Sequence, residues 1–557
     1  MHFVSDLPLS SIFNVFDRKG DTDAAGYRLK TIEENEPWAY PDHRNHIAAP
    51  AASYEKVAAA VTDIFTQRSP QAMTLSELLQ VLEKTLSYVP SSTNTAEAAD
   101  ISLYDHQKLT AAFAVCLWHV FQERGITDYK SYCYGKRQKA LRSAPVYRLA
   151  SGDISGIQKF IYTIPSKGAL KSLRGRSLYL DILLEHIVDE ILEACHVSRS
   201  CLLYTGGGHF YLLLPNTAHT QAVLQKADSL INDWFLKHYG TKLYIALASE
   251  PCSADDFSVR GGGAGKVFQK VSQALGQKKL CRYDEQQLTA LFDGQSKYNK
   301  DTDGSRECAI CHTASPSADL QPYGEDTGDG AEEACASCNA LFRLGKSSLT
   351  ASMFVISPSA GREGVPLPGL AQPYYLQAIR KKELAAMDKP KRIYVKNEIT
   401  LGQAVSTHLW MGDYITCNEQ GHAVEFTELA QQSGGSREET GIARIGVLRG
   451  DVDNLGAAFI AGFSSSYDTL SRKVTLSRNL SLFFKQYIKE ICQSHTAEGT
   501  PGFTLFTDEV KRERKVHVIY SGGDEAGTIC SWPVPGMTFW KLPSISAMPS
   551  GVLPMGN

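Results

Sequence analysis

The chain has 557 residues, of which 43% are hydrophobic and 21% charged, and its net charge is -3. This length predicts about three or four domains, and the balanced charge excludes a global field that would draw the protein to nucleic acid. No apolar stretch is long enough to predict a membrane span, and the N-terminal residues do not have the pattern of a signal peptide. With 13 cysteines in such a sequence, we expect a cytoplasmic protein whose thiols are reduced.

Five regions are expected along the chain, and together they predict an α+β protein. Residues 1–145 carry apolar residues at three- and four-residue spacing, which predicts a mainly helical region. Residues 146–255 predict the order β-α-β-β-α-β, which is typical of a ferredoxin-like unit. We expect a linker and a helical, zinc-binding domain over 256–435, a second unit over 436–532, and an irregular tail over 533–557.

Two segments of the chain carry the same landmarks in the same order, which indicates an internal repeat. S-G-D-I-S-G-I-Q-K-F-I at 151–161 matches R-G-D-V-D-N-L-G-A-A-F-I at 449–460, because each predicts a strand, a Gly-Asp pair and a helix. T-G-G-G-H-F at 205–210 matches S-G-G-D-E-A at 521–526, because each predicts a Gly-Gly hairpin between two strands. The repeat therefore predicts two ferredoxin-like units in one chain.

The second unit is predicted to hold a catalytic site that depends on metal ions. In a β-α-β-β-α-β sheet the end of the first strand lies beside the hairpin tip, so Asp451 and Asp453 come close to Asp524 and Glu525. Carboxylates crowded together repel one another unless cations lie between them. Two Mg²⁺ or Mn²⁺ ions held there could activate an attacking hydroxyl and neutralise a triphosphate leaving group.

Glycines precede these acids, and Gly522 and Gly523 would let a triphosphate approach the backbone closely. Taken alone, a Gly-Gly-Asp stretch is also ordinary hairpin chemistry. The first unit has Gly208 and His209 where the second has its two hairpin acids. We therefore interpret the first unit as a binding half and the second as the catalytic half.

Four motifs together resemble the large palm-domain subunit of type III-A CRISPR effector (Csm) complexes. They are G-D-I-S-G-I-Q-K-F-I-Y, L-K-S-L-R-G-R-S-L-Y-L, G-V-L-R-G-D-V-D-N-L-G and L-S-R-N-L-S-L-F-F, and the resemblance extends from Pro8 to Glu525. It implies two polymerase- or cyclase-like palm domains that convert ATP into cyclic oligoadenylate when guide RNA pairs with target RNA. The implied partners are guide CRISPR RNA, target RNA and the other Csm backbone and RNA-tag-binding subunits, with no membrane.

The resemblance also assigns roles to residues of this sequence. Asp451 and Asp524 correspond to metal-binding carboxylates, and Gly522–Asp524 corresponds to a Gly-Gly-Asp-Asp motif. Ser155 and Gly156 correspond to the nucleotide-facing loop of the first palm. The residues expected to bind nucleotide are Gly152, Asp153, Ser155, Gly156, Gly206, Gly207, Asn454, Gly522 and Gly523.

The sequence departs from the family's pattern in three ways. Glu525 stands where the family usually has Asp, which would alter the metal geometry. No His-Asp dipeptide occurs, so we do not expect the single-strand DNase activity that many members carry in an N-terminal domain. After Cys530 the prolines of the tail disfavour the helix that the first unit's pattern requires. We therefore expect an incomplete second palm, with catalysis impaired by it.

Paired C-x-x-C motifs predict a structural zinc site. C-A-I-C supplies Cys308 and Cys311, and C-A-S-C supplies Cys335 and Cys338. Four thiolates at this spacing suit tetrahedral Zn²⁺, and a closed site of four cysteines is structural. The alternative is a chance pairing of reduced cysteines.

Three basic stretches, at 167–176, 380–392 and 511–515, could contact RNA phosphates or triphosphate. A solvated surface is the commoner explanation for such stretches, but residues 167–176 lie beside the nucleotide-facing loop, so phosphate contacts are expected there. Two alternatives to the cyclic oligoadenylate synthase remain open from the sequence. One is a diguanylate cyclase-like enzyme, and the other is a scaffold subunit that binds guide and target RNA and has a catalytically dead palm.

Overall fold

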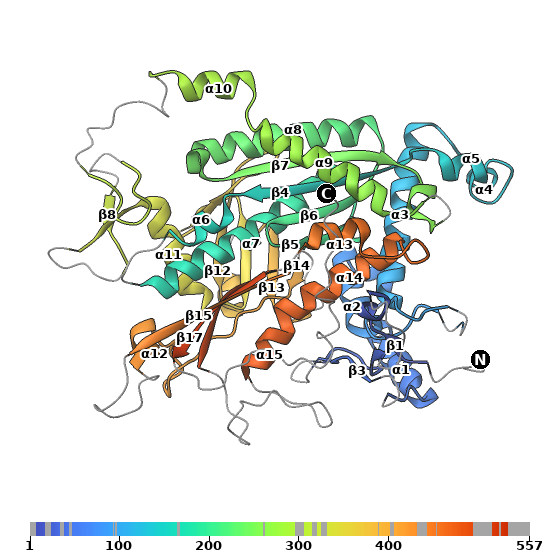
Figure 1. Ribbon diagram of the computed structural model, residues 1–557, viewed down its shortest axis with the longest axis horizontal. Coiled ribbons are helices and arrows are strands. Elements are labelled where there is room, and N and C mark those ends of the chain that lie inside the picture. Colours follow the sequence, from blue (N-terminus) through green and yellow to red (C-terminus); the bar gives the residue numbers. More distant parts are fainter. Residues whose placement is uncertain are drawn as a thin grey trace, which may run out of the picture.

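A computed structural model of the protein (Figure 1) describes residues 7–16, 24–33, 38–43, 47–92, 94, 97–163, 168–259, 262–295, 306–314, 320–324, 331–361, 363–387, 389–400, 406–431, 443–452, 454–493, 515–522 and 525–532. For residues 406, 525, 526 and 530–532 it describes the backbone alone. Helices and largely antiparallel sheets alternate along the chain, which confirms the expected α+β class. In the part of the chain described, no helix combines the length and the apolar character needed to cross a membrane.

The N-terminal region holds helices and a small antiparallel sheet in the order β1-β2-β3. Helix α2 begins at a capping box in which Thr74 and Glu77 exchange side-chain and backbone hydrogen bonds, and Ser102 caps α3. The elements are β1 (Leu9–Ser10), β2 (Ala25–Tyr27), β3 (Asp42–His43), α1 (Ala51–Gln67), α2 (Leu75–Leu86), α3 (Leu103–Glu123), α4 (Tyr129–Cys133) and α5 (Gln138–Ser143).

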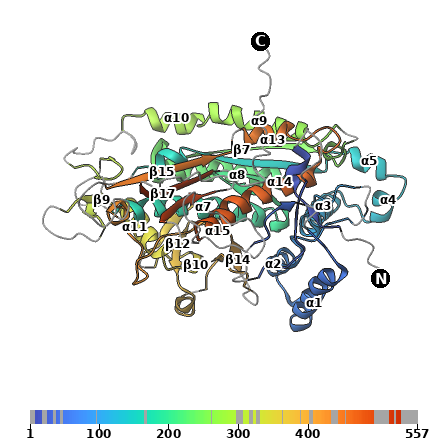
Figure 2. The same cartoon turned by 60° about the horizontal axis from the view of Figure 1, so that its bottom comes forward.

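The first repeat unit is built around an antiparallel sheet in the order β5-β6-β4-β7. Helix α7 is almost completely buried, because the insert that follows the unit packs against it on the side away from the sheet. Figure 2 shows α7 at the centre of the molecule. The elements are β4 (Tyr147–Ser155), α6 (Ile157–Ile161), α7 (Ala169–Ala194), β5 (Leu202–Gly206), β6 (His209–Pro215), α8 (Ala218–Tyr239) and β7 (Tyr244–Cys252).

The region expected to be a helical zinc-binding domain is helical only in part, and that expectation is corrected here. A five-stranded sheet in the order β11-β12-β10-β13-β14 follows its helices. Its strands are rich in β-branched and aromatic residues, for example M-F-V-I-S and R-I-Y-V-K, which pack well on a pleated surface. The elements are α9 (Gly265–Leu280), α10 (Glu285–Phe292), β8 (Leu320–Pro322), β9 (Glu333–Cys335), α11 (Ala336–Ser348), β10 (Met353–Ser357), β11 (Val365–Leu367), β12 (Tyr374–Ile379), β13 (Arg392–Lys396), β14 (Ser406–Leu409) and α12 (Phe426–Gln431).

The second repeat unit has three described strands in the order β15-β17-β16. This is the arrangement of β4, β6 and β5 in the first unit. The predicted tail, 533–557, lies outside the described residues. The elements are β15 (Arg444–Asp451), α13 (Leu455–Ala461), α14 (Leu470–Leu482), a π-helical turn (Phe483–Tyr487), α15 (Ile488–Gln493), β16 (Val516–Ser521) and β17 (Glu525–Trp532).

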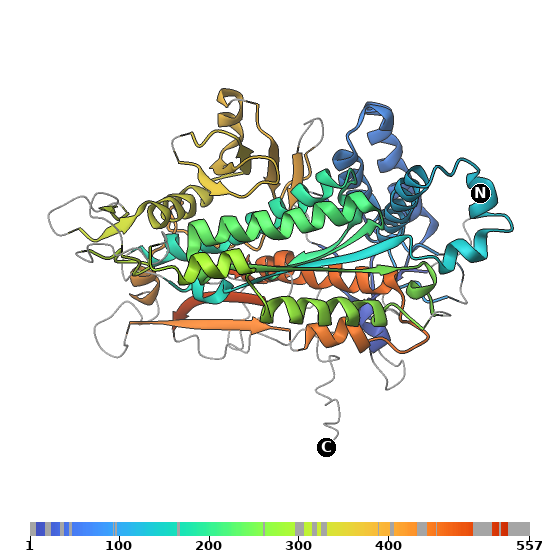
Figure 3. The same ribbon diagram turned by 90° about the horizontal axis from the view of Figure 1, so that it is seen from above.

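The two repeat units pack against each other in the middle of the molecule (Figure 3). Phe459 of α13 lies against Tyr204 and Tyr211 on the first unit's sheet, with ring centroids 5.9 Å apart in each pair. Phe268 of α9 is nearly parallel to the Phe459 ring. The N-terminal region and the cysteine-rich segment lie at opposite ends.

Candidate active site between the two repeat units

The strand registers of the two units place corresponding residues at corresponding positions. In the second unit Asp451, at the end of β15, lies opposite Glu525, at the start of β17. In the first unit Asp153 of β4 lies opposite His209 of β6. The end of the first strand and the hairpin are therefore neighbours in both units. Of the other expected catalytic residues, Asp453 and Asp524 lie outside the described residues, as does the expected nucleotide-binding Gly523.

Glycine-dependent turns hold the first unit's loops in place. Gly207 and Gly208 have φ values of 58° and 83°, so the two central residues of the β5–β6 turn are left-handed, a conformation that glycine adopts without steric cost. Gly156 has φ 94°, and a Cβ there would lie 2.0 Å from the Lys242 carbonyl oxygen. It precedes α6 as left-handed Asn454 precedes α13.

Close packing also explains Gly152, another residue expected to bind nucleotide. A Cβ on Gly152 would lie 2.3 Å from Cε1 of Phe210, the residue paired with it across the sheet. Ser155 ends β4 and is half-buried beside this turn region. The glycines thus have structural reasons for their positions that do not require a nucleotide.

The two corresponding aspartates differ in their electrostatic surroundings. The Asp153 carboxylate lies 3.3 Å from Nδ1 of His209 and 2.7 Å from Nζ of Lys279. Burial raises the pKa of Asp153, but the hydrogen bonds and charges of His209 and Lys279 outweigh it, so that its pKa is lower than the ordinary value. Asp451 is exposed, and among the described residues it has no ion-pair partner. The protein therefore neutralises one aspartate itself and leaves the other available to external cations.

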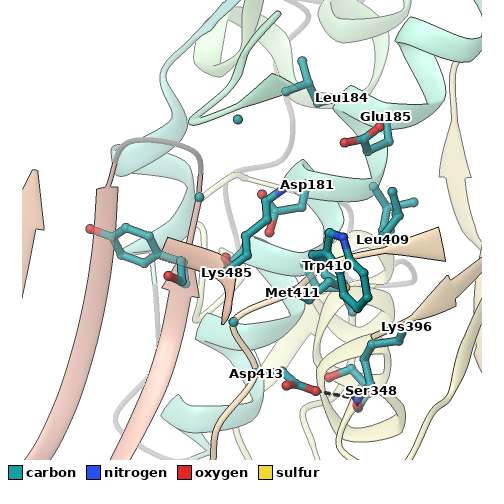
Figure 4. A pocket seen from close by; sticks show the side chains of 18 of the residues that line it. Asp181, Leu184, Glu185, Ser348, Lys396, Leu409, Trp410, Met411, Asp413 and Lys485 are labelled. Carbon is teal, nitrogen blue, oxygen red and sulfur yellow. Dashed lines mark hydrogen bonds and ion pairs between the residues drawn. The ribbon is translucent and has the colours of Figure 1, made fainter. Parts of the chain in front are cut away.

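A cavity lies between the units at the hairpin ends (Figure 4). Gly206, from the end of β5, and Gly522, beyond the end of β16, both line it. Trp410 and Met411 supply an apolar wall, and Lys485 supplies a cation. No sequence pattern pointed to this part of the wall, because β14 and the π-helical turn reach the cavity from distant parts of the chain.

Hydrogen bonds fix the second unit's hairpin strand against the first unit. The Arg174 guanidinium of α7 donates to the Val518 carbonyl over 2.9 Å, and the hydroxyls of Tyr162 and Tyr520 are 3.3 Å apart. Helix α7 and the end of α6 in the first unit thus lie against the strand that leads into the expected catalytic hairpin of the second.

In the described part of the basic stretch, 168–176, the side chains do not form the exposed phosphate contact expected of them, and Lys167 lies outside the described residues. Arg174 and Arg176 are buried, and Arg176 donates to the Phe160 carbonyl and to Cys338 Sγ. Lys171 pairs with Glu425. The two arginines satisfy internal acceptors and do not lie on a solvated surface, whereas the partner of Lys171 is half exposed. In stretch 380–392, Arg392 is likewise buried against acids of α7.

The four predicted zinc ligands come together in the structure. The Sγ atoms of Cys308, Cys311, Cys335 and Cys338 all lie within 4.8 Å of one another, and those of Cys311 and Cys335 are 3.9 Å apart. Tetrahedral Zn²⁺ with Zn–S bonds of about 2.3 Å needs sulfur separations of roughly 3.8 Å. The donor set therefore fits zinc, and the hydrogen bond from Arg176 to Cys338 would offset part of its negative charge.

Family models match two segments of the chain. Residues 146–294 match domain B of the Csm1 subunit, and residues 444–538 match the second palm domain of Cas10/Cmr2. These segments contain the first and second repeat units. The domain B match extends beyond 255, the expected end of the first unit, and includes α9, which carries Lys279.

Curated relatives and solved structures agree with these matches. The CRISPR system single-strand-specific deoxyribonuclease Cas10/Csm1 (subtype III-A) of Mycobacterium tuberculosis is 35% identical over 95% of this chain and 63% of the relative. The protein of the same name from Enterococcus italicus is 34% identical over 94% of this chain and 64% of the relative. The chain thus spans less than two thirds of these relatives.

Crystal structures of Csm1–Csm4 assemblies share the fold. The Csm1–Csm4 subcomplex of the type III-A CRISPR-Csm interference complex has a TM-score of 0.69 and 24% identity, covering 95% of this chain and 62% of that one. The Csm1–Csm4 cassette in complex with cA4 has a TM-score of 0.66 and 23% identity, covering 95% of this chain and 61% of that one. Over 95% of its length, the chain is therefore a homologue of the Cas10/Csm1 subunits of subtype III-A CRISPR systems.

Proposed function

We propose that this chain is the palm-bearing subunit of an RNA-guided type III-A Csm complex and synthesises cyclic oligoadenylate from ATP when target RNA binds. Its two repeat units act as ferredoxin-like palms, the first binding nucleotide and the second catalysing the reaction. The observation that carries the proposal is the shared strand register. It aligns Asp451, whose side chain is exposed, and Glu525 in one unit with Asp153 and His209 in the other, where Asp153 is already paired with His209 and Lys279.

In the second palm, Asp451 and Asp524 would hold Mg²⁺ or Mn²⁺, with Asp453 and Glu525 contributing. Carboxylate oxygens are the ligands that these hard cations prefer, and exposed Asp451 is free to supply one. The bound metals would supply Lewis-acid activation of a 3′-hydroxyl and charge neutralisation at the triphosphate. The chain's own contribution is to hold the carboxylates at adjoining strand ends.

The cavity between the palms supports a binding role for both hairpins. Gly206 and Gly522 line it, Gly207 continues the first turn, and Gly523 follows Gly522 in the sequence. The apolar wall at Trp410 suits a nucleobase, while Lys485 suits a phosphate. The remaining expected contacts, at Gly152, Asp153, Ser155, Gly156 and Asn454, surround the strand ends of the two palms.

The proposed partners follow from the homology. Guide CRISPR RNA, target RNA and other Csm subunits would bind the chain within the cytoplasm, and a Csm4-type subunit is the partner present in the solved relatives. Zn²⁺ would be structural at the four cysteines. We do not extend the deoxyribonuclease activity of the curated relatives to this chain, because its sequence contains no His-Asp dipeptide.

The test uses the assembled complex with target RNA, labelled ATP and Mg²⁺ or Mn²⁺, beside an Asp524→Ala variant. Cyclic oligoadenylate that forms with wild-type protein and disappears with the variant supports the proposal. No product, with target RNA still bound, would identify a scaffold whose palm is catalytically dead. A cyclic dinucleotide formed from GTP without RNA would instead identify a diguanylate cyclase-like enzyme.

A further inference from the structure

A basic, tyrosine-rich segment extends from one end of the molecule and has no role in the proposed catalysis. This segment, residues 124–142, contains α4 and α5 and is called the α4–α5 projection here (Figures 1 and 3). Its sequence, R-G-I-T-D-Y-K-S-Y-C-Y-G-K-R-Q-K-A-L-R, holds six basic residues and one acidic residue, whereas the whole chain has a net charge of -3. The local charge is therefore opposite to that of the protein.

Specific contacts fold the projection into a defined shape. The Tyr129 ring stacks on Phe121 of α3 at 5.6 Å, and the Tyr132 ring lies at the same distance. Arg137 donates to the Tyr132 hydroxyl over 2.8 Å. A Cβ on Gly135 would lie 2.8 Å from the Ser131 carbonyl oxygen, so the turn between α4 and α5 requires glycine.

The first palm anchors the base of the projection. Arg142 Nε and the Ser143 hydroxyl donate to the two carboxylate oxygens of Asp255, over 3.0 Å and 2.8 Å. The pairing uses one of the six basic side chains. The projection is thus held by α3 at its α4 end and by the first palm at its α5 end.

Apart from Arg137 and Arg142, the basic side chains of the projection make no contact with other described residues that holds the fold, and neither does one aromatic ring. Arg124, Lys130, Lys136 and Lys139 are exposed, and in the described part of the chain none of them has an ion-pair partner. Tyr134, which lies among these lysines, is 85% exposed. An aromatic ring normally contributes packing area, so a ring this exposed on a folded segment is available to a ligand.

We propose that the α4–α5 projection binds single-stranded nucleic acid. Lysines that lack internal partners can neutralise backbone phosphates, and an exposed tyrosine can stack on an unpaired base, which a duplex does not offer. The proposal concerns binding alone, so it stands whether or not the palms make cyclic oligoadenylate. If the chain is a Csm subunit, the single strand that binds here would be an RNA of the complex or another strand near the complex.

The test measures binding of labelled 20-nucleotide single-stranded RNA, single-stranded DNA and duplex RNA to the full chain by fluorescence anisotropy at several salt concentrations. The triple variant Lys130→Gln, Lys136→Gln, Lys139→Gln removes three proposed phosphate contacts. Its matched control replaces three exposed lysines of α8 and α9, as Lys226→Gln, Lys237→Gln, Lys270→Gln. We expect the slope of log affinity against log salt to fall by about 2 in the triple variant, at roughly 0.7 per lost contact, and to change little in the control.

A tyrosine pair tests the stacking contact. Tyr134→Ala should weaken single-strand binding by about fivefold to a hundredfold, and Tyr134→Phe should retain it, because phenylalanine keeps the aromatic face. An Asp524→Ala variant should bind like wild type, which separates this result from loss of catalysis. The proposal is overturned if the triple variant behaves like its control, if duplex RNA binds as tightly as single strands, or if polyglutamate of equal charge competes as well as RNA.

Discussion

Asp153 and Asp451 occupy the same register position in the two repeat units but have different chemical surroundings. A histidine of the first unit and a lysine of α9 neutralise its aspartate, which therefore needs no external cation there. The second unit leaves its aspartate exposed, opposite another acid. A difference in a few side chains thus separates a neutral, structural strand end from one suited to hold metal ions.

The first prediction concerns the amide variant of the exposed aspartate. Asp451→Asn should lower cyclic oligoadenylate formation by about 100-fold or more, because an amide does not carry the negative charge that holds a divalent cation at the triphosphate. Product formation by the assembled complex measures this. Asp63→Asn, at an exposed position of α1, is the matched control. Equal activity of the two variants would contradict a metal-binding role for Asp451.

The second prediction is a pH dependence of stability caused by His517. Burial, together with the charge of Arg174, lowers the pKa of His517 to about 4. Below pH about 6.5 this histidine is protonated in the unfolded chain but stays neutral in the folded chain. The free energy of unfolding therefore falls as the pH drops from about 6.5 to about 4. At the acid end of this range, one such histidine lowers the free energy of unfolding by about 3 kcal/mol.

His517→Leu should therefore reduce the loss of stability between pH 7.5 and pH 5. Urea unfolding at the two pH values measures the loss. His106→Leu, which changes an exposed histidine of α3, should leave the loss as it is in wild type. A wild-type loss that persists in His517→Leu would show that other groups cause it.

Among the elements, α7 connects the zinc segment to the second palm. It crosses α11 so closely that a Cβ on Gly175 would lie 1.9 Å from the Leu341 carbonyl oxygen, and one on Gly345 would lie 1.8 Å from the Lys171 carbonyl oxygen. Along the same helix, Arg176 bonds to Cys338 and Arg174 bonds to β16. The cysteine cluster is therefore linked through one helix to the strand that leads into the catalytic hairpin.

The third prediction tests the helix crossing. Gly175→Ala should destabilise the protein by at least about 1–3 kcal/mol, because the added methyl group meets a backbone carbonyl that cannot move without shifting α11. Chemical denaturation measures the change. Gly276→Ala is the control, since a Cβ there meets nothing within 4 Å, and it should stabilise α9 by about 0.5–1 kcal/mol. A tolerated Gly175→Ala would contradict the close crossing.

The fourth prediction concerns removal of zinc. The protein should contain one zinc per chain by elemental analysis, as a closed set of four cysteines binds one ion. Chelation should increase hydrogen exchange first around Cys308–Cys311 and α11, then in α7, because α11 packs on α7. In Cys335→Ser the bound zinc should be lost. Full zinc content in that variant would contradict the ligand role of Cys335. Hydrogen exchange that rises equally everywhere would contradict the predicted order, from the cysteines and α11 to α7.

Some features of the fold and site could be predicted from the sequence because their determinants are local. Glycine turns, the Gly-Asp strand ends and the C-x-x-C spacing are short patterns with direct conformational or ligand preferences. Thus the α+β class and the cysteine cluster are confirmed. The roles of Asp524 and Asp453 stay predictions.

Other features depend on contacts between distant segments, and the sequence did not reveal them. The lysine that neutralises Asp153 comes from α9. The buried side chains of Arg174 and Arg176 donate hydrogen bonds to acceptors in β16 and in the cysteine cluster. A run of basic residues in a sequence therefore predicts a solvated surface, unless the buried hydrogen-bond acceptors of its side chains are known. The five-stranded sheet was missed because each strand is short and its partners follow irregular loops.

Across the whole molecule, the N-terminal region holds the helices of the second palm. Arg478 of α14 donates to both carboxylate oxygens of Asp105 in α3, over 2.8 Å and 3.0 Å, and Arg472 pairs with Asp100. Asp105 is 1% exposed at its side chain. Residues more than 370 positions apart therefore form two largely buried ion pairs, and we expect the two regions to unfold together.

The last prediction tests whether the N-terminal region and the second palm unfold together. Arg478→Met removes the cation and leaves the Asp105 charge buried without its partner, which should cost about 3–5 kcal/mol. Unfolding followed by tryptophan fluorescence and by far-ultraviolet circular dichroism should give one shifted transition with coincident curves. Arg380→Met, which breaks an ion pair with Glu383 that is half exposed, should cost less than about 1 kcal/mol. If Arg478→Met costs no more than Arg380→Met, or if the two probes separate already in wild type, the N-terminal region and the second palm are stable independently of each other.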